Sequence, residues 1–310
     1  MRRQGLRCLS LSRWLPASFV VSFTVAVLSF FGVSGSDISF FGVYIVLCLA
    51  LPGLLLIRAL YGGSRTLAEE IALGAALGYA LEVFTYIAAR AIGLPLLVLA
   101  WPVGTYVLFL TVPRLRRHWR GGSHRTDKAP AWWSWSLALI VMYLVALGAV
   151  TFLRSNALVW PSLGAANIDM PYHLALIGEL KNHMPPKLPM VAGESLFYHW
   201  FIYAHFAAAS WVTGVEPLVL LFRLATLPML AALVVLLGMI GRRITGSWVG
   251  ALTAIVGTVF MTAPNLYLGV NIGMFTWRGF QSWTGPSLTF GAMLFAPVVL
   301  LFVDLLERRR

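Results

Sequence analysis

The stretch "WWSWSLALIVMYLVALGAVTFL", residues 132–153, contains no charged residue. About 20 consecutive apolar residues are enough for a helix to cross the hydrocarbon core of a membrane. The rest of the chain carries further apolar runs, at 14–31, 39–61, 67–89, 94–112, 197–213, 218–240, 247–263 and 287–304. The pattern predicts an all-α fold, a polytopic transmembrane bundle of about 8–9 membrane helices.

The composition agrees with a membrane protein. Of the 310 residues, 59% are hydrophobic and 11% are charged, whereas soluble domains are about 25% charged. The net charge of +12 does not indicate nucleic-acid binding, because the basic residues lie in short segments between apolar runs, as in cytoplasmic loops of membrane proteins. The two cysteines, Cys8 and Cys48, have no partner at the spacing of a metal or disulfide motif.

The N-terminal segment "MRRQGLRCLSLSR" precedes the apolar run 14–31. This arrangement fits either a signal peptide or a retained first helix. The run is longer than the apolar part of most signal peptides, about 7–15 residues. We therefore interpret it as a retained helix.

Basic residues also predict the orientation. Arginines crowd the N-terminus, and the loop 113–130 holds five arginines and one lysine. Cytoplasmic loops carry such an excess, so we expect a multi-pass plasma-membrane protein with a cytoplasmic N-terminus. The prediction divides the chain into a four-helix region, 1–131, and a second membrane region, 132–310, with outer loops at 154–196 and 264–286.

The run 197–213 decides the parity of the later helices. If 197–213 and 218–240 both cross, the basic "GRR" at 241–243 lies outside. If only one crosses, that cluster returns to the cytoplasm. Histidine is costly in hydrocarbon, and this run carries His199 and His205. We therefore predict a partly embedded or re-entrant helix on the outer side, with His205 as a hydrogen-bonded core residue.

The first outer loop contains the polar stretch "NIDMPYHLALIGELKNHMPP", residues 167–186. Asp169 can cap a helix, Pro171 is tolerated in its first turn, and Pro185 prevents its continuation. The stretch predicts a juxtamembrane helix on the outer face. Capping alone is a sufficient role for Asp169.

A second role for Asp169 follows from spacing. Asp169 and His173 are four residues apart and therefore share a helix face. A carboxylate and an imidazole together can act as base and orienting group, or bind a divalent metal. Glu194 and His199, in "GESLFYHW" at 193–200, follow before the next apolar run and can approach the same place.

These residues resemble a known family. The polar stretch 167–186, the segment "GESLFYHWFIYAHFAAASWVTG" and the apolar helices after it are similar to the first outer loop of GT-C glycosyltransferases. The resemblance covers about 150–263 and includes a small loop and arginine at Gly214–Arg223. These integral membrane enzymes use polyprenyl-phosphate sugars. In the family, the acid at the position of Asp169 is the candidate base or metal contact.

The resemblance implies transfer of a sugar from a polyprenyl-phosphate donor at the outer membrane face. Asp169 and His173 would be catalytic and would hold the metal, Mg or Mn. Arg278 would bind the lipid phosphate, and Trp277, Tyr172, Glu194 and His199 would contact the substrate. Tryptophan at this depth also serves as a plain interfacial anchor. Partners would be the donor lipid, membrane lipids and a further membrane subunit.

Two other functions stay open. Glu82 lies within an apolar run and indicates a proton or ion path, hence a transporter or flippase. Met170 follows Asp169 where the family commonly has a second acid, and 264–286 contains no acid. That composition favours a non-catalytic relative or a structural subunit, or a chain that is the front part of a longer transferase.

Overall fold

The computed structural model describes residues 2–61, 65–120, 129–158, 169–260, 263–264, 271–272 and 283–307. The described part consists of helices joined by turns and irregular segments, with one pair of two-residue strands. In the first half, the elements are α1 (Arg2–Phe30), α2 (Gly35–Tyr44), η1 (Ile45–Ala50), α3 (Leu51–Leu60), α4 (Leu67–Ala91), η2 (Pro95–Leu99), α5 (Ala100–Thr111), α6 (Pro113–Arg116), η3 (Arg117–Arg120), α7 (Ala131–Gly148) and η4 (Ala149–Leu153).

The second half begins with α8, the helix predicted in the first outer loop. Its elements are α8 (Asp169–Asn182), α9 (Phe201–Thr213), α10 (Pro217–Val219), η5 (Leu220–Leu224), α11 (Thr226–Thr245), α12 (Trp248–Phe260), β1 (Ala263–Pro264), β2 (Asn271–Ile272) and α14 (Pro286–Glu307). The two strands pair antiparallel, with Ala263 opposite Ile272. Every apolar run expected from the sequence contains a helix.

The described part of the chain has five continuous helices that are long and apolar enough to cross a membrane. A sixth crossing is possible where Pro95–Thr111 and Pro113–Trp119 are joined at a bend of 97°. The apolar parts of α1 and α12 are shorter. The molecule is therefore a multi-pass helical membrane protein, and the count of about 8–9 membrane helices stays a prediction. The five helices are Gly35–Leu60, Leu67–Ala91, Ala131–Leu153, Pro217–Thr245 and Pro286–Glu307.

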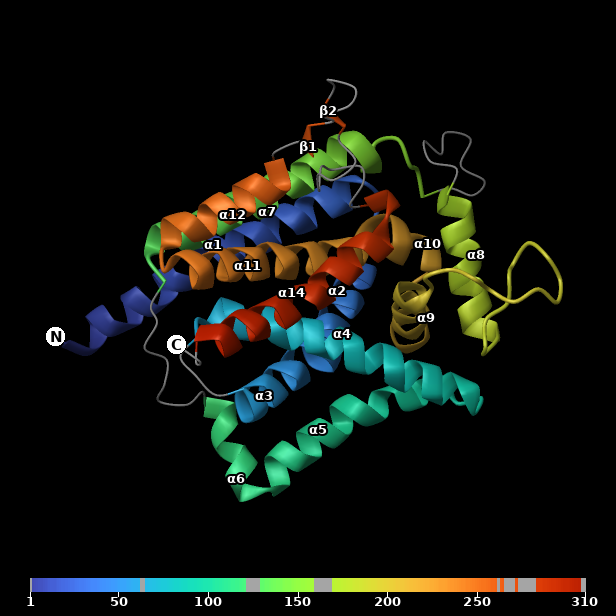
Figure 1. Cartoon of the computed structure of the whole chain (residues 1–310), viewed down its shortest axis with the longest axis horizontal. Helices are drawn as coiled ribbons and strands as arrows, with labels where there is room; N and C mark the ends of the chain where they lie inside the picture. The colour runs from blue at the N-terminus through green and yellow to red at the C-terminus, as the bar shows by residue number, and fades with distance from the viewer. Residues whose placement is uncertain are drawn as a thin grey trace.

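The long helices lie side by side along the longest axis of the molecule, whereas α8 runs across one end (Figure 1). One hydrophobic core connects them, from Leu28 in α1 to Leu300 in α14. Both 1–131 and 132–310 contribute residues to this core. The end of the bundle at which α8 lies is called the α8 end below, and the other is called the basic end.

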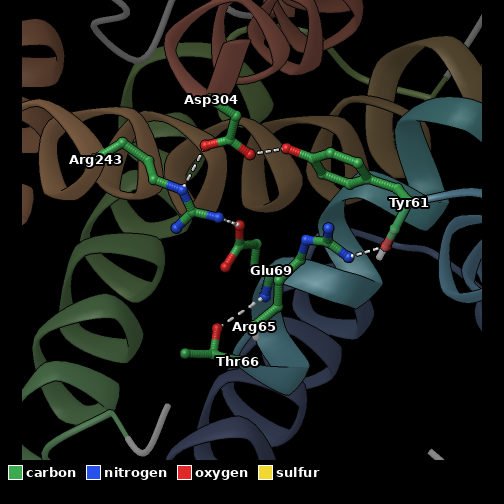
Figure 2. Close-up of polar contacts among 6 residues, drawn as sticks. All are labelled: Tyr61, Arg65, Thr66, Glu69, Arg243 and Asp304. Atoms are coloured by element: carbon green, nitrogen blue, oxygen red, sulfur yellow. Dashed lines mark hydrogen bonds and ion pairs between the residues drawn. The ribbon is translucent and has the colours of Figure 1, made fainter. Parts of the chain in front are cut away.

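Two ion-pair clusters hold helices together at the basic end. Arg243 in α11 donates to Glu69 at 2.8 Å and to Asp304 in α14 at 2.9 Å (Figure 2). The Tyr61 hydroxyl donates to the same Asp304 carboxylate, and Arg65 donates to the Tyr61 carbonyl at 2.6 Å. Burial, more than the bond to Asp304, raises the pKa of Tyr61 to about 12.

The second cluster joins α3 to α4 and η3. Arg58 donates to Glu70 at 2.8 and 3.0 Å, and to the carbonyl of His118 at 3.1 Å. The arginines of "GRR", 241–243, therefore lie at the same end as Arg58 and the basic segment near 118. This is the arrangement expected if 197–213 does not cross the membrane.

Helix α9 is short for a definite local reason. It ends at Gly214, whose φ of 73° is left-handed and favours glycine, and Pro217 then begins α10. Thirteen residues give a helix of about 20 Å, which is less than the hydrocarbon thickness of about 30 Å. The length supports the prediction of a partly embedded helix.

Candidate functional site

Helix α8 packs against α9 at the end of the bundle (Figure 1). Asp169 lies in its first turn and Lys181 in its last, each with the sign of charge that the helix dipole favours. His183 follows the helix, is exposed, and pairs with Glu179 at 3.0 Å. The buried face of α8 carries side chains three or four positions apart, Met170, His173, Leu176, Ile177 and Leu180.

The other end of α8 is attached to α4. The Tyr86 hydroxyl donates to the Leu180 carbonyl at 3.0 Å, and Arg90 donates to the carbonyl of Asn182. Lys181 also donates to Ser210 in α9 at 2.8 Å. The predicted helix therefore exists with the expected bounds, and it is fixed to the bundle by contacts along its whole length.

Both ring nitrogens of His173 have partners. Nε2 lies 3.2 Å from the carbonyl oxygen of Thr284, and Nδ1 lies 2.6 Å from the hydroxyl of Tyr203. A carbonyl oxygen can only accept, so Nε2 carries the hydrogen. In the neutral imidazole Nδ1 then accepts from Tyr203. The ring thus connects α8, α9 and the segment before α14.

Aromatic rings surround this histidine. The His173 ring stacks on Tyr203 at 5.2 Å, and Tyr172 meets Tyr198 edge to face at 5.3 Å. Tyr198 in turn stacks on His199 at 3.9 Å. Rings in such contacts hold one another in place, so the cluster gives the α8 end a preformed aromatic wall.

The surroundings of His173 change its pKa in opposite directions. Burial lowers the pKa of His173, and His199 adds to that effect. The bond to Thr284 and the carboxylate of Asp169 raise it, but burial is the largest cause. The imidazole is therefore neutral in conditions where an exposed histidine is partly protonated. Asp169 is exposed and close enough to influence the ring electrostatically.

A cavity of about 320 Å³ opens beside this cluster, between α4, α9 and α14. Its polar lining residues are His199 and Ser287. Ser287 lies 3.5 Å from the hydroxyl of Tyr203, which connects the cavity to His173. The remaining lining is apolar, from Ala80, Val83, Phe84, Phe201, Ile202, Phe290, Gly291 and Leu294.

The structure brings together four of the residues expected at the site: Asp169, Tyr172, His173 and His199. Glu194 is elsewhere, in the exposed segment between α8 and α9, where its carbonyl accepts from the Leu188 amide at 3.0 Å. Its side chain makes no hydrogen bond or ion pair with any described residue. The other two expected residues, Trp277 and Arg278, lie outside the described residues.

The metal role of Asp169 and His173 stays a prediction. Within the described ranges, no group of three or more His, Cys, Asp or Glu side chains is placed to bind a metal. A metal at His173 would have to replace either Tyr203 or the Thr284 carbonyl as the partner of a ring nitrogen. Asp169 and His173 alone therefore do not complete a metal site, and a divalent ion would need further ligands.

Arg223 holds the segment that leads towards α8. It is buried and donates to the carbonyls of Asn156 at 2.5 Å and Leu153 at 3.4 Å. It also lies 3.5 Å from the carbonyl of Phe31, just after α1. These carbonyls belong to helix C-termini, where a cation is favourable. Arg223 thereby ties the ends of α1 and α7 to η5.

Sequence reasoning missed Tyr203, Thr284 and Ser287. They lie 30, 111 and 114 positions after His173, on other elements. Tyr203 was detectable in principle, because it is a polar ring on the same short helix as His205. The other two carry no local signal, since a threonine before a helix and a serine in its first turn are ordinary at helix starts.

A second polar cluster lies inside the bundle. Glu82 in α4 accepts from the Tyr44 hydroxyl and contacts Nδ1 of His205 at 2.7 Å. The partner expected for a membrane acid is therefore a histidine of α9. The prediction of His205 as a hydrogen-bonded core residue is confirmed at this nitrogen.

No family model, curated protein or solved structure matches the chain. The fold and the apolar helices define its class, a multi-pass helical membrane protein with a histidine–tyrosine cluster at one end of the bundle.

Proposed function

We propose that the chain is a membrane glycosyltransferase-like protein that transfers a sugar from a polyprenyl-phosphate donor at the α8 end. The observation that carries the proposal is the cavity between α4, α9 and α14. Its walls suit a hydrocarbon chain, and its polar edge, His199 and Ser287, leads to the cluster around His173. A lipid-linked substrate needs this combination of an apolar groove and an adjacent polar site.

In this proposal, Asp169 removes the proton from the acceptor hydroxyl. The acceptor oxygen then forms a bond to the anomeric carbon of the sugar, and the bond from that carbon to the phosphate oxygen breaks. Polyprenyl phosphate leaves with the electron pair. The exposed position of Asp169 at the helix end supports this role, because an acceptor can reach it.

The other residues take supporting roles. Neutral His173 positions Tyr203 and the start of α14, while Tyr172 and His199 line the approach. Arg278 is the proposed ligand of the donor phosphate and Trp277 the proposed sugar contact, as the sequence predicts. A divalent metal, if the activity needs one, would neutralise the leaving phosphate.

The test is a transfer assay in proteoliposomes with a panel of polyprenyl-phosphate sugars, with and without Mg²⁺ or Mn²⁺. We expect Asp169→Asn to lower the transfer rate by about 100-fold or more, the usual contribution of a general base. The matched control is Asp37→Asn, at the first turn of α2 and at the same end of the bundle. Equal rates for wild type and Asp169→Ala would refute the catalytic role.

Transport is the second candidate function, and the buried Glu82–His205 pair favours it. The same proteoliposomes can be loaded with labelled lipid-linked sugar to measure movement between leaflets. Movement that stops in Glu82→Gln, without any sugar transfer, would identify a flippase. If a well-folded preparation shows neither sugar transfer nor lipid movement, the remaining function is that of a structural membrane subunit.

A further inference from the structure

The Glu82–His205 pair is enclosed in the bundle. Glu82 is 1% exposed and His205 is 0% exposed. Glu82 lies nine residues before the end of α4 at Ala91, about 14 Å along the helix. In a membrane-spanning helix, this depth is within the hydrocarbon region.

Among the described residues, the titratable groups beside Glu82 bring no second strong charge to the pair. The titratable groups that face Glu82 are Tyr44, Cys48, Tyr79 and Tyr86, together with His205 itself. Hydroxyls and a thiol are neutral near pH 7. The pair must therefore balance its own charge.

Its immediate neighbours are aromatic. The Tyr79 ring lies 4.7 Å from the His205 ring, and the rings of Phe206, Phe41 and Tyr44 lie within 6.4 Å. Such a site is poorly polarisable, and a net charge in it is costly. The Tyr44 hydroxyl bond alone reduces that cost only in part.

Counting protons identifies the stable state. With one proton on the pair, Glu82 is ionised and His205 is neutral, and the net charge is −1. With two protons, the pair is neutral overall, either as carboxylate with imidazolium or as carboxylic acid with imidazole. A buried site of this kind favours the state with no net charge.

The one-proton and two-proton states of the pair differ at Nε2 of His205. In both two-proton forms Nε2 of His205 carries the hydrogen, whereas in the one-proton form it is bare. Nε2 is buried and has no hydrogen-bonding partner among the described residues. A proton gained or lost at Nε2 leaves the bond between Nδ1 and Glu82 in place.

We propose that Glu82 and His205 form a proton-binding site inside the bundle, with Nε2 of His205 as the atom that gains and loses the proton. The site is joined to the α8 end by α9. Tyr203, the partner of His173, lies two residues before His205 on this short helix. Loss of the proton leaves a buried negative charge beside α9, which weakens its packing on α4 and shifts Tyr203 against His173.

The experiment follows the six histidines by magnetic resonance in lipid nanodiscs, using isotope-labelled histidine and a pH titration. An exposed histidine of ordinary pKa releases its proton near pH 6.5. We expect the second proton of the Glu82–His205 pair to leave in a separate step, seen as the loss of the hydrogen on Nε2 of His205 as the pH is raised. Signals of His173 should change in that same step.

Two variants test the assignment. Glu82→Gln keeps the shape of the side chain and should abolish the high-pH step together with the linked change at His173. Tyr44→Phe removes one donor to the carboxylate and should move the step up by about one pH unit. The control, His183→Gln, replaces an exposed histidine and should leave the step of the buried pair and the linked change at His173 in place.

A His205 signal that stays that of a neutral, Nε2-bare imidazole throughout the titration would overturn the proposal. So would an unchanged step in Tyr44→Phe. A step that occurs without any change at His173 would overturn the link through α9. Because sugar transfer is not measured, these outcomes do not depend on whether the proposed catalysis is right.

Discussion

Single buried polar side chains carry most of the specific geometry in this apolar molecule. His173, Glu82 and Arg223 are each nearly excluded from solvent, and each joins at least two elements. A buried polar group is costly unless it is hydrogen-bonded, so such residues fix the helices in one arrangement. Their partners are rings and backbone carbonyls more often than opposite charges.

The first residue-level prediction concerns pH. Burial lowers the pKa of His173 in the folded chain, whereas in the unfolded chain its pKa is about 6.5. At a pH between these two values, the unfolded chain binds a proton at His173 and the folded chain does not. Stability is therefore complete above about 6.5 and declines as the pH falls through that window. Thermal unfolding in detergent should show this decline, and His173→Gln should reduce it.

The control for this prediction is His183→Gln. His183 is exposed and outside the helix, so its replacement should leave the acid sensitivity in place. An equally acid-sensitive His173→Gln variant would show that another group causes the effect.

Close contact between two helices determines the position of α3 on α4. Gly53 and Gly74 face each other so closely that a Cβ at Gly53 would lie 1.9 Å from the Gly74 carbonyl oxygen. A Cβ at Gly74 would lie 2.5 Å from the backbone nitrogen of Leu54. Backbone atoms cannot move aside as side chains can, so the helices would have to separate.

The element-level prediction follows from this contact. Gly74→Ala should destabilise the bundle by about 1–3 kcal/mol, the usual range for overpacking, measured as a lower melting temperature in detergent. Gly104→Ala in α5 is the matched control, because its Cβ would meet nothing within 4 Å. That variant should be neutral or slightly more stable, as alanine is the better helix former. A Gly74→Ala protein as stable as wild type would contradict the account.

The two ends of the whole molecule differ in chemistry. The basic end holds the ion pairs of Arg58 and Arg243, and the α8 end holds the cluster around His173. Cytoplasmic segments are rich in arginine and lysine. We therefore expect the basic end inside the cell and the α8 end outside.

Labelling tests this orientation. In a chain with Cys8 and Cys48 replaced by serine, Ser195→Cys is exposed at the α8 end and Ser247→Cys is exposed at the basic end. An impermeant thiol reagent applied to intact cells should label the first and spare the second. The reverse labelling pattern would show that the orientation is opposite to the one expected, with Asp169 facing the cytoplasm.

The sequence by itself determined the helices, the bounds of α8 and the class of membrane protein. These depend on local properties, namely apolar runs, prolines that end helices, and a glycine after α9. Asp169 and His173 were found because four residues separate them on one helix. The same reasoning placed Glu82 and His205 as separate polar residues in apolar runs.

Only the tertiary structure decided which polar groups meet. Glu82 and His205 are 123 positions apart, and His173 and Thr284 are 111 positions apart. Their proximity depends on how α4, α9 and α14 pack, and many packings satisfy the same apolar pattern. The cavity beside His199 also depends on the packing of the helices, because its walls come from α4, α9 and α14 together.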